Sequence, residues 1–464
     1  MAWPLIPPGI TPILDPAFRP AVLATRAFDQ EAHRAGVPVS VALERDAHSI
    51  SRFVTTVLPA QHPQAGCNFR HLERWLKFLL WSRGGGRVHF AGPVELGQQL
   101  QQHFRASPTG KFDAWLMGER VYERPFEVVV TTPERLPQAI EPSAPLGRHW
   151  DGCRIGFDLG ASDRKVAALR NGETVFSEEV AWNPKVFTDP QQHFDGIMDS
   201  LQRAAAHLPR VDAIGGSSAG VYVNNLVKVA SLFRGVPDEL FKQRGREIFL
   251  EIKRAWGGIP LEVVNDGEVT ALAGAMTLNE NAVLGIALGS SEAAGYVTPD
   301  GNITSWLNEL AFAPVDYNPN APADEWSGDR GCGAQYFSQQ CVDRLLPVAG
   351  IALDPKMPVP EKLVEVQTLM AKGDERAARI YHTIGAYLGY AIAHYCDFYE
   401  VRHLLILGRV TSGAGGAIIL DDAKQVLRQE FPNLRVQIHT PDEKEKRHGQ
   451  AMAAASLPRL FQNP

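Results

Sequence analysis

A carboxylate and an amide stand side by side where an apolar segment ends, in the sequence LEVVNDGEVTALAGAM. The segment predicts a strand, and Asn265 and Asp266 come at its carboxyl end, where side chains of an α/β sheet meet bound ligands. In that place Asp266 could accept a proton from a substrate hydroxyl while Asn265 hydrogen-bonds another hydroxyl. Asp266 could also cap the helix predicted after it, as aspartate often does. The sequence therefore predicts Asp266 as a general base, with helix capping as the alternative role.

A second carboxylate, Asp158, ends the strand predicted in RIGFDLG. Gly160 and Ser162 follow in a turn of small residues, whose backbone N–H groups can approach phosphate oxygens. Lys165 adds a positive charge nearby, and a carboxylate at such a strand end can hold Mg²⁺ through water. Because an Asp-Leu-Gly turn is often only a turn, its significance depends on whether the pattern recurs.

The pattern does recur, at a constant offset of 129 residues. The segments FDLGASDRKVAALRNGETV and IALGSSEAAGYVTPDGNIT pair Leu159 with Leu288, Gly160 with Gly289, Ser162 with Ser291, Asp163 with Glu292 and Gly172 with Gly301. Two unrelated hairpins would share some Gly and Ser, but agreement at one offset over the whole hairpin favours a duplication. We expect two facing lobes whose turns hold a polyphosphate between them, the second turn being formed by Gly289, Ser290 and Ser291.

Two further segments contain residues suited to ligand binding. HLLILGRVTSGAGGAIIL predicts a strand, a glycine-rich turn and a helix, and Gly408 and Gly413 leave in that turn a bare surface for a purine and ribose. Ser217 and Ser218 lie in IGGSSAG, which lacks the GxSxG pattern of a hydrolase nucleophile. We interpret this second segment as a loop that lines the cleft and contacts substrate.

Alternating strands and helices from residue 152 onward provide an α/β framework for these residues. The Pro-rich segment PQAIEPSAPLGRHWDG has little apolar periodicity and predicts a domain boundary before this framework. Ahead of it, helices are predicted at 68–82 and 94–104 and strands at 87–93 and 126–132. We divide the chain into an N-terminal α/β module at 1–150, a first lobe at 151–280 and a second lobe at 281–464.

Composition and charge narrow the function classes. The 464 residues are 45% hydrophobic, as in globular proteins, and a net charge of -6 without a long basic run argues against nucleic acid or membrane as partner. Neither a signal-peptide pattern nor an apolar stretch of about 18 residues is present, so we expect a cytoplasmic protein. Five scattered cysteines without a CxxC spacing predict reduced thiols.

In their order, the first hairpin, Asp266, the second hairpin and the glycine-rich turn resemble the actin, hexokinase and sugar-kinase superfamily, and within it the ROK family. DLGASDRK at 158–165 is similar to the hexokinase-type DxGGTNxR, NDGE at 265–268 to NDAN, and ELAF at 309–312 to ELGH. SGDRGCGAQYFS is similar to CGxxGCLEAYAS. The resemblance covers residues 152 to about 458 and implies a two-lobed, actin-like ATPase fold of the duplicated ribonuclease H-like kind, here with an additional N-terminal α/β module.

The resemblance implies ATP- and Mg²⁺-dependent phosphorylation of a hydroxyl on a sugar or sugar-like polyol. Asp266 would be the base, Asn265 and Glu309 would bind substrate, and Asp158 and Lys165 with the two turns would hold metal and phosphates. The family's zinc ligands, one histidine and three cysteines, correspond here to Phe312, Glu325, Ser327 and Cys332, so we expect no zinc site. Phe312 and Ala334 also replace two sugar contacts, which predicts an atypical substrate.

Glu292 favours a second hypothesis, because it stands where the family has the glycine-rich GTGxGGG and a negative charge there would oppose ATP phosphates. The alternative is a non-catalytic sugar or nucleotide sensor of the ROK type that signals through residues 1–150. A ROK-like DNA-binding repressor would need a basic recognition helix, which the sequence does not show. The oligomeric state stays open, with a homodimer as one candidate.

Overall fold

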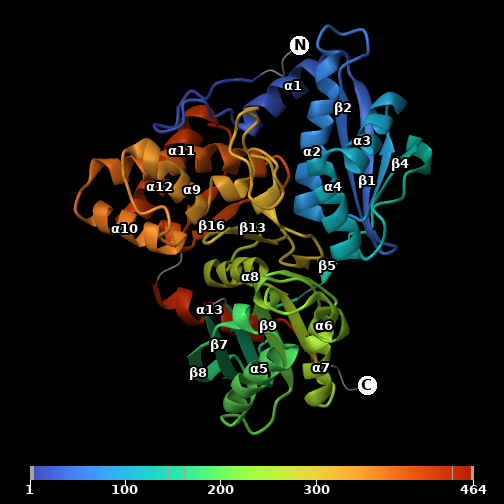
Figure 1. Ribbon diagram of the computed structural model, residues 1–464. Helices are drawn as coiled ribbons and strands as arrows, with labels where there is room; N and C mark the ends of the chain where they lie inside the picture. The colour runs from blue at the N-terminus through green and yellow to red at the C-terminus, as the bar shows by residue number, and fades with distance from the viewer. Residues whose placement is uncertain (1–4, 142, 145, 161, 441–442, 461–464) are drawn as a thin grey trace.

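The structure is a computed structural model that describes residues 5–141, 143–144, 146–160, 162–440 and 443–460. These residues form sheets of four, five and six strands and one two-stranded ribbon, with helices packed on the sheets (Figure 1). The four-stranded sheet belongs to the N-terminal module, and the two larger sheets belong to the two lobes. No helix in these residues is both long and apolar enough to cross a membrane.

The first lobe is built on the five-stranded sheet, in the order β12-β9-β6-β7-β8. Its strands are β6 (Cys153–Leu159), β7 (Asp163–Arg170), β8 (Glu173–Ala181), β9 (Ala213–Ser218) and β12 (Leu261–Asn265). Strands β6, β7 and β8 form an antiparallel meander, whereas β9 and β12 run parallel to β6. Helix α5 (Pro190–Ala205) connects β8 to β9, and helices α6 (Asp238–Gln243) and α7 (Ile248–Ala255) lie between β9 and β12 in the chain. The α5 helix begins at a capping box made by Asp189 and Gln192.

The second lobe repeats this topology in the six-stranded sheet, in the order β17-β16-β13-β14-β15-β5. Its strands are β13 (Val283–Leu288), β14 (Glu292–Val297), β15 (Ile303–Thr304), β16 (His403–Leu407), β17 (Gln437–His439) and β5 (Ser143–Ala144). Leu159 and Leu288 both end their strands, and Asp163 and Glu292 both begin the next. The duplication predicted from the offset of 129 residues is therefore confirmed.

Two helices lie between the lobes, α8 (Asp266–Leu278) and α13 (Glu443–Ala455) (Figure 1). The first packs on β13 and β14 of the second lobe, and the other on β6, β7 and β9 of the first. A Cβ atom at Gly215 would lie 1.7 Å from the Ala454 carbonyl oxygen, so only glycine allows α13 to lie this close to β9. Each sheet thus packs against one of these helices: α8 directly precedes β13 in the chain, whereas α13 returns to the first lobe from the C-terminal part.

The outer side of the second lobe is helical. It contains α9 (Gln339–Ala349), α10 (Val359–Ala371), α11 (Glu375–Tyr395) and α12 (Ala414–Glu430). Helix α11 is buried along nearly its whole length and packs closely against α12. It begins at Asp374, whose carboxylate accepts a hydrogen bond from the Arg376 backbone N–H.

The N-terminal module has its own four-stranded sheet, in the order β2-β1-β3-β4. Its elements are α1 (Ala21–Ala35), β1 (Val37–Asp46), β2 (Ser49–Val57), α2 (Asn68–Arg83), β3 (Arg87–Ala91), α3 (Val94–Ala106), α4 (Pro108–Ala114) and β4 (Glu127–Thr131). A π-helical segment, Trp115–Tyr122, continues from α4. The predicted helix at 68–82 and the predicted strand at 87–93 correspond to α2 and β3.

The N-terminal module packs on the second lobe, and the two share one hydrophobic core. Phe78 of α2 stacks on Phe398 with 3.9 Å between ring centroids. The chain before α1 also lies on the second lobe, because the Ile10 N–H donates to the Tyr390 hydroxyl and the Leu14 N–H to the Thr383 hydroxyl. Residues 5–20 and strand β5 are thus integrated into the second lobe, outside the sheet of the module.

Candidate functional site

Three parallel strands of the first lobe end together and bring the predicted first-lobe residues to one edge of the sheet. The register pairs Leu159 of β6 with Ser218 of β9, and Ser218 with Asn265 of β12. Asp158 therefore lies one residue before this edge, and Asp266 one residue after it. Residues more than 100 positions apart in sequence form one site because the strands are parallel.

Asp158 is buried, with 5% of its surface exposed, and two polar groups face its carboxylate. The Ser217 hydroxyl donates a hydrogen bond of 2.7 Å to it, and the Lys165 ammonium lies 3.6 Å away. Burial raises the pKa of Asp158, although Lys165 and Ser217 oppose that shift. Lys165 also pairs with Asp163 at 3.1 Å, so its charge is shared between two carboxylates.

Ser217 and Ser218 differ from the predicted cleft-lining loop, because they are the last two residues of strand β9 and both are fully buried. Ser217 supports Asp158, and the Ser218 hydroxyl accepts a hydrogen bond of 2.7 Å from Tyr222. Both hydroxyls thus interact with protein groups inside the lobe. Buried side chains with these partners support the site from within the lobe and do not line the cleft as predicted.

Asp266 is the first residue of α8, and its neighbour Asn265 caps the helix. The Asn265 side chain accepts a hydrogen bond of 2.7 Å from the Gly267 N–H and donates one of 2.7 Å to the Gly220 carbonyl. Because Asn265 performs the capping, Asp266 is not required for it. Burial, followed by the negative charge of Asp158, raises the pKa of Asp266 to about 6. The carboxylate is thus poised to exchange a proton near neutral pH.

The backbone at the start of α8, next to Asp266, contacts strand β14 of the second lobe. A Cβ atom at Gly267 would lie 2.2 Å from the Ala294 carbonyl oxygen, and one at Gly295 would lie 2.1 Å from the Gly267 carbonyl oxygen. The two glycines therefore let the start of α8 lie directly against β14. Strand β14 follows the second predicted phosphate turn, so Asp266 lies near the hairpin of the opposite lobe. Sequence reasoning missed this pair of glycines, although both stand within quoted motifs.

Glu309 is positioned by helix α2 of the N-terminal module. Its N–H donates to the Trp81 carbonyl at 2.9 Å, and the Asn308 N–H donates to the Ser82 carbonyl at 3.0 Å. Burial, followed by the charge of Asp266, raises the pKa of Glu309 to about 7. The two carboxyl groups predicted as base and substrate contact are therefore electrostatically coupled.

Asn308 and Glu268 are site residues to which the sequence analysis assigned no role. The Asn308 amide donates to the Glu268 carboxyl at 3.2 Å and accepts from the Tyr399 hydroxyl at 2.9 Å. Burial raises the pKa of Glu268 to about 8. These bonds join α8 to the segment that carries Glu309. Glu268 was visible in the NDGE motif, but nothing in the sequence indicates that Asn308 lies next to it.

The two predicted phosphate turns have similar closing bonds. The Gly160 N–H donates to the Asp163 carbonyl at 2.9 Å, and the Gly289 N–H donates to the Ser291 carbonyl at 3.0 Å. Ser162 in the first turn and Ser290 in the second are exposed, as is Ser291. Both turns thus present small, hydroxyl-bearing residues outward, as a phosphate site requires.

Glu292 corrects the expectation of a negative charge beside ATP phosphates. Its side chain points away from the second turn into the core, where Tyr395 donates a hydrogen bond of 2.9 Å to it. Only 3% of Glu292 is exposed, and burial raises its pKa to about 8. The carboxyl is therefore mostly neutral near pH 7, and the charge objection to ATP binding is removed.

The glycine-rich turn after β16 adjoins the second phosphate turn. Gly408 has a φ of 108°, and a Cβ atom there would lie 2.4 Å from the Leu288 carbonyl oxygen. Gly413 precedes α12 with a φ of 73°, and a Cβ atom there would meet no atom within 4 Å. The turn is therefore tied to the end of β13 at one side and open at the other, which suits a ligand lying at a helix N-terminus.

The residues at the family's zinc positions do not fit a zinc ion. Phe312 stacks on Trp81 with 4.2 Å between ring centroids, and the Ser327 hydroxyl donates to Asp324 at 2.8 Å. Cys332 is fully buried, and burial followed by the charge of Asp329 raises the pKa of its thiol, which opposes the thiolate that zinc requires. In the described part of the chain, no group of three or more His, Cys, Asp and Glu side chains is arranged to hold a metal.

No protein-family model matches the sequence, and no curated protein matches it significantly. Solved structures are similar in fold. A ROK hexokinase from Thermus thermophilus aligns with a TM-score of 0.53 and 16% identity over 65% of this chain and 96% of its own. A ROK family glucokinase from Streptomyces griseus, in complex with glucose and AMPPNP, aligns with a TM-score of 0.50 and 17% identity over 66% of this chain and 98% of its own.

A ROK family transcriptional regulator, described as a homolog of the E. coli MLC protein, aligns with a TM-score of 0.51 and 20% identity over 66% of this chain and 76% of its own. At these identities the likeness shows the fold alone. Kinases and a regulator share that fold, so it is compatible with both hypotheses formed from the sequence. The chain therefore contains the two-lobed, actin-like ATPase fold of the ROK proteins, joined to an N-terminal module.

Proposed function

We propose that this chain catalyses ATP-dependent phosphorylation of a hydroxyl group on a sugar or sugar-like polyol, with Asp266 as the general base. The observation that carries this proposal is that the Asp266 carboxylate has no structural role in capping α8 and has a raised pKa. It begins α8 without being needed to cap it, and no other side chain among the described residues hydrogen-bonds to it. Its pKa of about 6 suits a base that works near neutral pH.

The surrounding residues fit a substrate and a nucleotide. Glu309 and Asn265 would bind substrate hydroxyls beside Asp266. Phosphates would be held by the outward-facing residues of the two turns and by Lys165, and the adenosine by the open turn at Gly408 and Gly413. Asp158, buried with a raised pKa, would gain from a divalent cation nearby. Bound Mg²⁺ would neutralise phosphate charge. The hexokinase and the glucokinase of similar fold support this class of reaction.

The test is Asp266→Asn, which keeps the shape of the side chain and removes the base. We expect phosphorylation across a panel of sugars and polyols to fall by roughly 10²- to 10⁴-fold, with ATP and sugar binding retained. Asp300→Asn, at an exposed position in the second hairpin, is the matched control. In the wild-type chain, kcat/KM should fall as pH drops below about 6, because Asp266 becomes protonated there. Undiminished turnover in Asp266→Asn would contradict the assignment of Asp266 as the general base.

A non-catalytic sensor is the second candidate, and the transcriptional regulator of similar fold favours it. The N-terminal module contacts both lobes and could transmit a ligand-dependent change. Its Glu123 pairs with Lys228 of the first lobe, while α2 packs on the second. Calorimetry that detects sugar or nucleotide binding, without ATP turnover of any sugar in the panel, would decide for this candidate.

A further inference from the structure

Five aromatic side chains from two distant parts of the chain meet beside Glu309. Trp81, Phe112 and Trp115 come from the N-terminal module, and Phe312 and Trp326 from the second lobe. Ring centroids lie 4.2 Å apart for Trp81 and Phe312, 5.6 Å for Phe112 and Trp326, and 6.0 Å for Phe112 and Trp115. We call Trp115, Phe112, Phe312 and Trp326 the aromatic row, with Trp81 beneath it.

The two ends of the aromatic row are open to solvent. Trp326 is 54% exposed and Trp115 is 37% exposed, whereas Trp81 is only 1% exposed. Exposing two tryptophans to water is unfavourable, so exposed rings that belong to one aromatic cluster commonly mark a binding surface. The row thus packs on the buried Trp81, while Trp115 and Trp326 remain accessible to a ligand.

The aromatic row adjoins the proposed substrate site through Glu309. The Phe312 N–H donates to the Glu309 carbonyl at 3.2 Å, and the Glu309 N–H donates to the Trp81 carbonyl at 2.9 Å. Glu309 is in turn electrostatically coupled to Asp266. A ligand held by Glu309 would therefore lie close to Phe312, a middle member of the row that contacts both Phe112 and Trp326.

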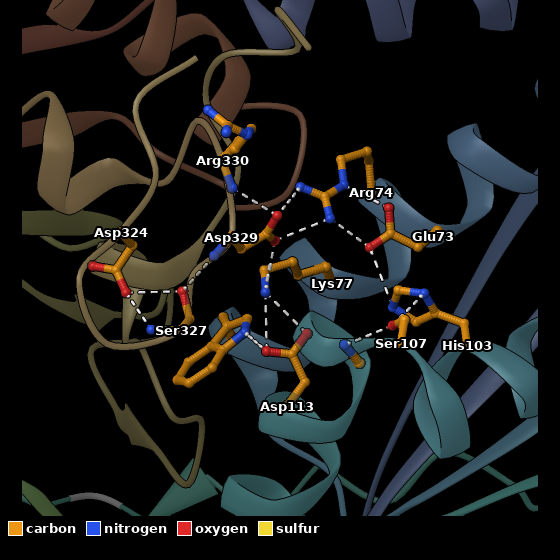
Figure 2. A network of polar contacts seen from close by, with 12 residues as sticks. Glu73, Arg74, Lys77, His103, Ser107, Asp113, Asp324, Ser327, Asp329 and Arg330 are labelled. Atoms are coloured by element: carbon orange, nitrogen blue, oxygen red, sulfur yellow. Dashed lines mark hydrogen bonds and ion pairs between the residues drawn. The ribbon is translucent and has the colours of Figure 1, made fainter. Parts of the chain in front are cut away.

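A buried ion network fixes the two halves of the row to each other (Figure 2). The Lys77 ammonium lies 2.9 Å from both oxygens of Asp113 and 2.9 Å from Asp329. Asp113 directly follows Phe112 in the sequence and also accepts from the Trp81 indole N–H at 3.0 Å. Lys77, Asp113 and Asp329 are each less than a tenth exposed. The attraction among them is therefore little screened by water.

The same network holds the turn that carries Trp326. Arg74 pairs with Asp329 at 3.0 Å from the module side. Within the turn, Asp324 accepts from the Ser327 N–H at 2.7 Å (Figure 2). It also accepts from the Trp326 N–H at 3.1 Å. The backbone that carries the exposed indole is thus held in place by protein contacts alone, as in a preorganised site.

We propose that the aromatic row is a subsite for a second sugar ring, attached to the ring whose hydroxyl lies at Asp266. The apolar C–H faces of a sugar ring pack on aromatic faces, and the hydroxyls around its edge need polar partners. Lys111 directly precedes Phe112 and Glu325 directly precedes Trp326 in the sequence, and both charged side chains are exposed, which favours a sugar over a wholly apolar group. The substrate class is then a disaccharide or longer saccharide, and this assignment depends on the proposed function for the reaction itself.

The test compares single sugars with disaccharides by calorimetry and by phosphorylation, using glucose with maltose and cellobiose, mannose with mannobiose, and galactose with melibiose. We expect at least one disaccharide to bind about tenfold more tightly than its single sugar, which corresponds to about 1.4 kcal/mol. Trp326→Ala and Trp115→Ala should each remove most of that advantage and leave single-sugar and ATP binding within about twofold of wild type. Val348→Ala, at a position 57% exposed on α9, should change neither.

The subsite would be overturned by equal binding of single sugars and disaccharides, by a disaccharide preference unaffected by both tryptophan variants, or by tighter binding of an aryl glycoside than of every disaccharide. Loss of a dimer in Trp326→Ala on size-exclusion chromatography would assign the row to a second copy of the chain instead. Disaccharide preference in binding without phosphorylation would contradict the proposed function alone. Phosphorylation of single sugars without any disaccharide preference would contradict this inference alone.

Discussion

At the scale of single residues, strand alternation determines what Glu292 does. It is the first residue of β14, directly after a turn whose serines are exposed, yet its own side chain lies on the buried face of the strand. Its duplicate Asp163 is partly exposed and pairs with Lys165. Of the two duplicated carboxylates, one is therefore partly exposed and the other is buried. A sequence alignment of the two hairpins cannot show which face of its strand each carboxylate occupies.

We expect Glu292→Gln to stabilise the chain more at pH 8 than at pH 5. The folded pKa of about 8 lies above the unfolded value of 4.5, so the wild-type chain loses stability as pH rises through this range. Glutamine does not ionise and escapes that loss, which should separate the two chains by on the order of 2–4 kcal/mol at pH 8. Denaturant unfolding at both pH values measures the difference, with the exposed Glu280→Gln as control. An equal effect at pH 5 and pH 8 would contradict it.

Some site residues could be predicted from one short segment of sequence, whereas others depend on segments far away in the chain. Asn265 and Asp266 could be predicted because a strand end and a helix start are both visible in one segment. Asn308 could not, since its role depends on α2, more than 200 residues earlier, which supplies the Ser82 carbonyl that binds its N–H. The exposed or buried state of Ser217 and Glu292 likewise depends on packing that no single segment reveals.

At the scale of elements, α8 decides whether the two lobes share a site. Its start touches β14 through Gly267 and Gly295, and any side chain at either position would force the strand and helix apart. Helix α8 is buried along most of its length, so it has little room to shift in compensation. The separation of helix and strand here therefore sets the position of Asp266.

Gly267→Ala should cost about 1–3 kcal/mol of unfolding free energy, because the added methyl group meets the Ala294 carbonyl. Turnover should fall further than stability alone explains, since the substitution displaces the adjacent base. Chemical denaturation and steady-state kinetics measure the two effects separately. Gly66→Ala is the control, because a Cβ atom there meets nothing within 4 Å. Normal turnover in a destabilised Gly267→Ala would show that Asp266 is not positioned by this contact.

Elements with a clear local period were predictable from the sequence. Helix α2 and strand β3 lie where apolar spacing placed them, and the hairpin duplication was visible as a constant offset. The helix predicted at 94–104 likewise corresponds to α3. Strands β1 and β2 were not among the predicted elements, although Val39, Val41 and Leu43 of β1 alternate along the strand and are buried.

At the scale of the whole molecule, the N-terminal module is a structural part of the second lobe. Its core continues into α11, and Lys77 and Arg74 project from α2 to pair with Asp329 of the second lobe. The first lobe has a separate hydrophobic core. The sequence could not predict this packing, because residues 1–150 show no resemblance to the ROK family and the core they share with α11 joins segments about 300 residues apart.

This arrangement predicts that the N-terminal module and the second lobe unfold as one unit. Lys77→Met leaves Asp113 and Asp329 without their shared cation and should lower stability by about 3–5 kcal/mol. Hydrogen exchange followed by mass spectrometry should then show α2 and α11 losing protection together, while α5 of the first lobe keeps its protection.

Lys242→Met, at an ammonium 60% exposed on α6, is the control and should change stability by less than about 0.5 kcal/mol. Loss of protection confined to α2 and the module sheet would contradict the shared unit, since a module that opens alone cannot be holding the second lobe. If α5 also loses protection, the coupling extends to the first lobe through Glu123, which pairs with both Lys228 and Arg246. The single-unit prediction would then have to include all three parts of the chain.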